Sequence, residues 1–230
     1  MIRAAVVAVV LTAALAVSVP GARAADECAG LLVCIPVAGP WVAIPASSGA
    51  SATASWQLVC PVGVVGGVDA RASEAAVAVE FPGLLGSPVN PGITTTNLLV
   101  FRGTYAGRAR RITSFKPFIG CIPGGGGPRT PTSSSAAVKP GAPITTRVKT
   151  LRVGVGTLAR TTLGCRRGER LLRSSHSVGL YTSDVPAPAE LAAVRVIRVS
   201  RGGRVLVSAT RRGLAADVRV VVQVHAECAR

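Results

Sequence analysis

The chain has 230 residues, enough for one large domain or two small ones. Its net charge of +16 comes from 26 Lys and Arg residues against 10 acids, and only 3% of the residues are aromatic. Six cysteines without a C-x-x-C pair, and only two histidines, argue against a zinc site, and we expect no metal or other cofactor. Beyond the first 24 residues, no apolar run approaches the ~18 residues that would indicate a membrane span.

Residues 1–24 have the pattern of a secretory signal peptide. Arg3 supplies a positive start, residues 4–19 form an apolar core, and Ala22-Arg23-Ala24 is an A-x-A cleavage site. We therefore expect cleavage after Ala24 and a protein that is secreted or associated with the cell envelope. An N-terminal membrane anchor is the alternative, but the apolar run is short for a span.

Residues 25–46 form an N-terminal lead that contains two of the cysteines. Five residues separate Cys28 from Cys34, a spacing that a disulfide across a small hairpin loop can bridge. The alternative is that one of them ties the lead to a later domain. An even cysteine count in an exported chain is typical of disulfides. The side chain of Trp41 is predicted to be buried in the core as a plug that fills space, and not to bind a ligand.

Residues 47–123 are predicted to form a first β unit. A strand ends at Cys60, a tight turn follows, and the glycines after it predict a bent or bulged strand. Pro117, in the strand that leads to Cys121, predicts an edge position because proline cannot donate to a ladder. The predicted strands lie at 54–60, 62–68, 75–81, 94–101 and 114–119.

Residues 124–147 are predicted to be a linker, because the stretch is rich in Gly, Pro and Ser. Four consecutive glycines at 124–127 could suggest a phosphate-binding loop. No G-K-[ST] ending and no strand-to-helix context accompany them, so the linker interpretation is preferred.

Residues 148–230 are predicted to form a second, basic β unit. Its clearest signal is a hairpin in which Gly202-Gly203 supplies the positive φ angles of a two-residue loop between strands at 194–200 and 205–207. The last strand alternates strictly up to Cys228. That pattern predicts one buried face and one solvent face, with His225 on the solvent face.

The two units share a feature. Cys60-Pro61-Val62-Gly63 is followed by Cys121 after 60 residues, and Cys165-Arg166-Arg167-Gly168 by Cys228 after 62. We therefore predict a duplicated unit with disulfides Cys60–Cys121 and Cys165–Cys228, each contributing roughly 4 kcal/mol by closing its loop. The predicted fold class is all-β, with two tandem antiparallel β-sandwich-like units, each closed by a disulfide.

The run from Cys60 to Ala70, C-P-V-G-V-V-G-G-V-D-A, resembles β-rich repeats of uncharacterised secreted actinobacterial proteins. The resemblance covers the two cysteine-bounded units and departs at Arg166, which stands in the place of the proline. It implies a β-rich exported protein and no catalytic residues.

The charge is concentrated in the second unit. Residues 25–123 carry six cations against five acids, whereas residues 148–230 carry fifteen against five, a net charge of +10. This asymmetry indicates an anionic partner, because arginine forks suit phosphate and carboxylate groups. The alternative is a solvated basic surface, with arginine content that reflects a GC-rich genome. The candidate binding residues are Arg166, Arg167, Arg170, Arg201 and Arg204.

Catalytic patterns are weak. His176 lies beside three serines (Ser174, Ser175 and Ser177) with Asp184 downstream, but no G-x-S-x-G elbow is present. Asp69 follows two glycines, and we predict that it bonds local backbone in a turn.

We predict a non-enzymatic protein that binds an anionic envelope polymer or an acidic glycan. Nucleic acid is a poor partner, since Tyr181 is the only aromatic residue interleaved with the arginines. Two alternatives remain: a secreted hydrolase with His176 or Asp69 in its site, and an extracellular structural or adhesive domain.

Overall fold

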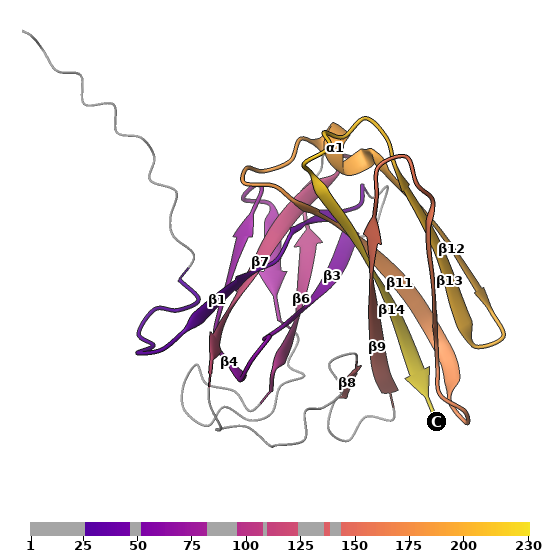
Figure 1. The fold of residues 1–230 in the computed structure, drawn as a ribbon, viewed down its shortest axis with the longest axis horizontal. Helices are drawn as coiled ribbons and strands as arrows, with labels where there is room; N and C mark the ends of the chain where they lie inside the picture. Colours follow the sequence, from indigo (N-terminus) through magenta and orange to yellow (C-terminus); the bar gives the residue numbers. More distant parts are fainter. Residues whose placement is uncertain (1–25, 47–51, 82–95, 108–109, 124–135, 139–143) are drawn as a thin grey trace, which may run out of the picture.

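The computed structural model describes residues 26–46, 52–81, 96–107, 110–123, 136–138 and 144–230. This part of the chain is almost entirely β-strand, which confirms the predicted all-β class (Figure 1). Its one helix, of five residues, falls well short of the ~20 that a transmembrane helix needs. The elements are β1 (Ile35–Ala38), β2 (Trp41–Ile44), β3 (Ala52–Val59), β4 (Val64–Ala72), β5 (Val77–Glu80), β6 (Leu98–Tyr105), β7 (Thr113–Ile122), β8 (Ala136–Val138), β9 (Ile144–Val153), β10 (Ala159–Gly164), β11 (Arg170–Tyr181), α1 (Pro188–Ala192), β12 (Val194–Arg201), β13 (Arg204–Arg211) and β14 (Arg219–Ala229).

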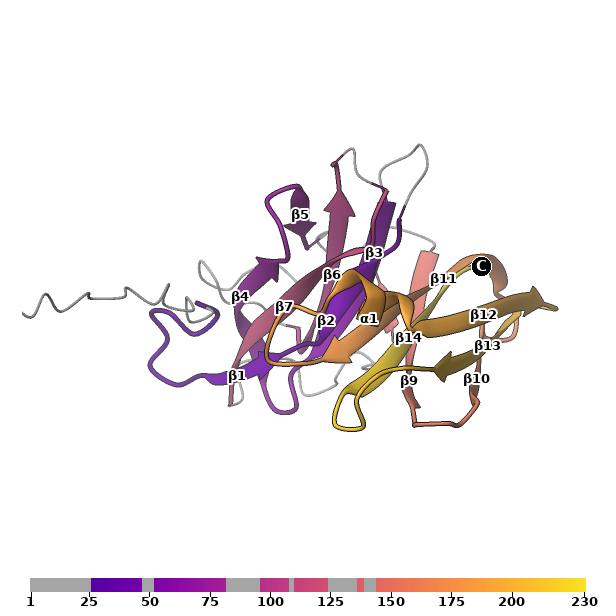
Figure 2. The same ribbon diagram turned by 90° about the horizontal axis from the view of Figure 1, so that it is seen from above.

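Three antiparallel sheets make up the described part of the molecule. The largest has the order β1-β7-β2-β11-β14-β9-β8, with β4 on the other side of β7. Two three-stranded sheets, β3-β6-β5 and β10-β13-β12, pack against it. Figures 1 and 2 show the first half of the chain, in indigo and magenta, on the left and the second half, in orange and yellow, on the right.

The two halves pair their strands in the same order. In the first half β7 lies between β2 and β4, and β6 lies between β3 and β5. In the second half β14 lies between β9 and β11, and β13 lies between β10 and β12. Each half is thus a pair of three-stranded ladders built from six successive strands, with β1 and β8 added at the side.

The predicted disulfides are confirmed. Cys60–Cys121 joins the turn after β3 to β7, Cys165–Cys228 joins the turn after β10 to β14, and Cys28–Cys34 closes a local loop. Both C-x-x-G turns end in a glycine with positive φ, +79° at Gly63 and +84° at Gly168, a conformation that side chains disfavour. The strand after each turn shifts register soon after it begins, as predicted for the first.

The β12–β13 hairpin is also confirmed. Gly202 and Gly203 form its loop with φ of +56° and +73°, and Arg201 pairs with Arg204 across the base of the loop.

The predicted unit boundaries do not coincide with separate sheets. β2, which lies in the predicted lead at 25–46, pairs with β7 on one side and β11 on the other. β8 and the start of β9 lie in the stretch predicted as linker, 124–147, whose remaining residues are outside the described part. The two halves therefore share one continuous sheet.

The junction between the halves is closely packed. Val42 and Trp41 of β2 pair with Gly179 and Leu180 of β11. A Cβ atom on Gly179 would lie 2.5 Å from Cγ of Pro40, so the close approach of the two strands requires glycine there. Trp41 is 4% exposed, which confirms the predicted buried plug.

Two hydrophobic cores lie on opposite faces of the shared sheet. Val42 and Phe115 face the first core, where they join Trp56 of β3 and residues of β6. Leu180 and the even-numbered valines of β14 face the second core, together with Val205 of β13 and other residues of the small sheet. The shared sheet passes from one core to the other near β11 and β14.

The prediction that β14 has one solvent face is wrong. Val221 on the supposed solvent face belongs to the first core, and both Gln223 and His225 are 5% exposed. The alternation itself is real, because Val222 and Val224 face the second core. Both faces are buried because a small sheet covers each of them.

The prediction of an edge position for Pro117 is also wrong. β7 has β4 on one side and both β1 and β2 on the other. Pro117 lies where β1 has ended at Ala38 and β2 has not begun, so its missing N–H interrupts no ladder on that side. Its carbonyl still accepts a hydrogen bond from Gly39, at 2.8 Å.

A side-chain amide links the two halves across 166 positions of sequence. Oε1 of Gln223 accepts from the backbone N–H of Gln57, and its Nε2 donates to the Gln57 carbonyl, both at 2.8 Å. Gln57 lies on β3, the edge strand of its sheet. Gln223 thus supplies the hydrogen bonds that a neighbouring strand would supply.

Replacing Gln223 with Leu should lower the free energy of unfolding by about 2 kcal/mol or more, because buried backbone groups of β3 lose these partners. Urea denaturation without reductant measures the change. Thr150→Leu, at the exposed position opposite Gln223 on β9, is the control and should change stability by less than about 0.5 kcal/mol. Equal stability of Gln223→Leu and the parent would contradict this role.

Candidate anion-binding site

Two turns meet at one end of the second half. The backbone N–H of Cys165 donates to the carbonyl of Gly203, at 3.3 Å, so the cysteine turn contacts the β12–β13 loop. The disulfide to Cys228 fixes the same turn to β14. Arginines from two separate stretches of sequence are therefore held on one rigid end of the fold.

Glu169 organises the cysteine turn. Its Oε2 accepts from the backbone N–H of Arg166 at 2.8 Å, and Arg147 of β9 donates to both carboxylate oxygens at 2.8 and 2.9 Å. The side chains of Arg147 and Glu169 are only 11% and 9% exposed. The hydrogen bond from Arg166, and next the bond from Arg147, hold the pKa of Glu169 below its ordinary value. Glu169 therefore forms an ion pair with Arg147, and the charge of Arg166 adds a further attraction.

All five predicted binding arginines are exposed at this end. Arg166 and Arg167 lie in the cysteine turn, and Arg170 begins β11. Arg201 and Arg204 are paired across the base of the hairpin loop. The structure therefore brings the predicted set to one region of the surface.

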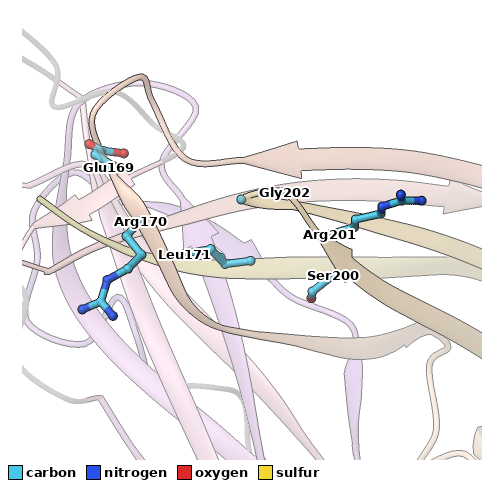
Figure 3. A pocket seen from close by; sticks show the side chains of 7 residues that line it. Glu169, Arg170, Leu171, Ser200, Arg201 and Gly202 are labelled. Atoms are coloured by element: carbon cyan, nitrogen blue, oxygen red, sulfur yellow. The ribbon is translucent and has the colours of Figure 1, made fainter.

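An open cavity of about 480 Å³ lies between Arg170 and Arg201. Figure 3 shows Arg170 and Arg201 on opposite sides of it, with side chains that point away from one another. The guanidinium groups of Arg170 and Arg201 therefore do not converge on one point. Such spacing suits an extended anion with repeated charges better than a single small anion. The cavity is lined by Glu169, Arg170, Leu171, Ser200, Arg201, Gly202 and Gly203.

The residues that resemble a metal site in the described part of the chain are Cys165, Glu169 and Cys228. Both cysteines are bonded to each other, which removes their thiolates as ligands. The remaining carboxylate is held by Arg147.

Ser174 and Asp184 do not form a catalytic triad with His176. The hydroxyl groups of Ser174 and Ser200 share a hydrogen bond, with 3.0 Å between the two Oγ atoms. Asp184 lies in the exposed loop that follows β11. Among the described residues, Nδ1 of His176 is buried without a hydrogen-bond partner. Burial, and next the charge of Arg198, lower the pKa of His176.

Asp69 accepts hydrogen bonds from backbone N–H groups, as predicted, although it lies within β4 and not in a turn. Its Oδ1 accepts from the N–H of Ala70 at 2.7 Å, and its Oδ2 accepts from the N–H of Asp26 at 3.1 Å. The neighbouring Glu27 was missed by the sequence analysis. It is 6% exposed, and burial raises the pKa of its carboxyl. No local pattern signals this burial, which arises because β4 and β7 carry glycines where the backbone of Glu27 packs.

Sequence reasoning also missed Arg147, since it was assigned to the linker. It lies on β9 opposite Ala226 of β14, which belongs to the second core. The sequence of β9 does not alternate strictly between apolar and polar residues, so no local pattern places Arg147 in the sheet.

Comparison of the chain with protein-family models, with curated proteins and with solved structures finds no match. The resemblance to actinobacterial repeats therefore stays a prediction.

His225 is a buried titratable group between the two halves. It hydrogen-bonds to the backbone of Ser55, while its Nε2 has no partner among the described residues. Burial lowers the pKa of its imidazole to about 4, from an ordinary value of 6.5. The imidazole is therefore neutral in the folded protein at neutral pH.

Stability should fall as the pH drops from 6.5 to about 4, because the unfolded chain binds a proton at His225 that the folded protein excludes. The expected loss is about 3 kcal/mol at pH 4 and none above pH 7. Urea denaturation at a series of pH values measures it.

His225→Gln should remove most of this pH dependence. His176 contributes a smaller slope of the same sign, because its pKa is lowered as well. An undiminished slope in the His225→Gln variant would show that the proton is taken up elsewhere.

Proposed function

We propose that this chain is an exported, non-enzymatic protein of the cell envelope or extracellular space. It binds an anionic polymer, such as an envelope polymer or acidic glycan, through arginines of its second half. The residues that carry the binding are Arg166, Arg167, Arg170, Arg201 and Arg204.

The observation that supports the proposal is the meeting of two arginine-bearing turns at one rigid end. The hydrogen bond between Cys165 and Gly203 and the Cys165–Cys228 disulfide fix their relative positions. The acid beside them, Glu169, is already paired with Arg147. An extended polyanion that runs over this end meets positive charges on both sides of the cavity at little cost in ordering the protein.

Export is part of the proposal. Three disulfides and no free cysteine in the described residues are typical of oxidising compartments outside the cytosol. We also propose that the chain contains an internal repeat, so that its two halves are copies of one unit. The identical pairing order of the two halves and their matching C-x-x-G turns support this.

Inorganic polyphosphate is a suitable probe because it repeats one negative group along a flexible chain. Replacing Arg166, Arg167 and Arg170 together with Gln should weaken its binding by roughly 10- to 100-fold, at about 0.5–1 kcal/mol for each exposed contact. Binding should also weaken as salt rises. Fluorescence titration of the full chain at two salt concentrations measures both effects.

The matched control replaces Arg110, Arg152 and Arg212 with Gln. These arginines are exposed and lie away from the two turns, and their loss changes the net charge equally. The proposal fails if both triple variants lose the same affinity, since net charge alone would then explain binding.

A further inference from the structure

The outer face of the β10-β13-β12 sheet has no covering layer in the described structure. Its inner face packs on the second core through Val205, Val207 and Ala209. Alternate residues point outward, and Figure 2 shows this sheet on the side of the molecule away from the first half. The outward positions are Arg160, Thr162 and Gly164 on β10, Arg195, Ile197, Val199 and Arg201 on β12, and Arg204, Leu206, Ser208 and Thr210 on β13.

The centre of this face is apolar. Ile197, Val199 and Leu206 are 52%, 53% and 46% exposed. Val199 lies directly opposite Leu206, and Ile197 is the next residue on the same face of β12, so the three side chains are contiguous. A solvent-facing sheet ordinarily carries polar residues at such positions. We call these three residues the apolar centre.

The rim of the same face is cationic. Arg201 and Arg204 flank the apolar centre at the hairpin loop, Arg195 lies beyond Ile197, and Arg160 lies on β10 opposite Ser208. β10, β12 and β13 contain no acidic residue in their sequences. We call these four arginines the arginine rim.

We infer that this face docks on an anionic lipid surface. The arginine rim contacts negatively charged headgroups, and the apolar centre inserts at the boundary between headgroups and acyl chains. Arginine suits the rim because its aliphatic stem packs on apolar surface while the guanidinium stays with the headgroups.

The combination of the apolar centre with the arginine rim favours an anionic lipid surface over other partners. A water-soluble polyanion would balance the arginines but leave the apolar centre in water. A second copy of the chain would cover the apolar centre but bring two arginine rims together, which like charges oppose. An anionic lipid surface satisfies both parts at once. The inference goes beyond the proposed function, with which it shares only Arg201 and Arg204.

The test is co-sedimentation of the full chain with vesicles. Phosphatidylcholine vesicles with about one-third phosphatidylglycerol should bind the protein, whereas pure phosphatidylcholine vesicles should bind it at least tenfold more weakly. Replacing Ile197, Val199 and Leu206 with Thr, which keeps β propensity, should reduce vesicle binding about tenfold or more and leave polyphosphate binding unchanged. These positions are exposed, so the fold should tolerate the change.

A second variant, Arg160→Gln with Arg195→Gln, alters only arginines outside the proposed polymer site. It should also weaken binding to the anionic vesicles, by on the order of tenfold, relative to Arg110→Gln with Arg152→Gln. Equal binding to both vesicle types, or unchanged binding of both variants, would overturn the inference. So would a dimer that the three Thr substitutions dissolve, because a second copy would then be the occupant.

The two proposals fail separately. Polyphosphate binding without vesicle binding would overturn the lipid inference alone. Vesicle binding without polyphosphate binding would support the lipid face and overturn the polymer site.

Discussion

The burial of β14 on both faces is the constraint on which the rest of the structure depends. A strand in an ordinary two-layer sandwich faces its core on one side and water on the other. Here the shared sheet carries the second core on one face of β14 and meets β3 of the first half on the other. Polar residues on that second face are acceptable only when they are satisfied, as Gln223 is by the backbone of Gln57, or neutral, as His225 is.

This double burial also restricts where a ligand can bind. Side chains of the two cores cover both faces of the shared sheet at its middle, and the pairing of β2 with β11 joins the two halves directly. The second half keeps two accessible regions that carry unusual chemistry: its arginine end and the outer face of its small sheet. Both lie away from β2 and the junction (Figure 2), so binding there would require no separation of the halves.

Local rules of sequence were sufficient for the features that depend on neighbouring residues. Gly202-Gly203 specifies its hairpin, and the glycine of each C-x-x-G turn specifies a positive φ. Features set by distant strands could not be read in this way. Nothing in residues 220–228 reveals that a strand from the first half covers them, and nothing near Trp41 reveals that its strand joins two halves. The candidate arginines were found from charge, but the role of Arg147 depends on a register that only the folded sheet provides.

The positions of the arginines in the fold are more informative about their roles than their number. Arg147 and Arg173 are paired with acids, and Arg211 is buried with its guanidinium bonded to backbone carbonyls. Those arginines serve the fold. On the three strands of the outer sheet, by contrast, no acid accompanies the arginines, and the residues between them are apolar although they face water. Enrichment in arginine by base composition alone does not explain why acids are missing from one face or why Ile, Val and Leu occupy its centre. The proposed docking on an anionic lipid surface would account for both features.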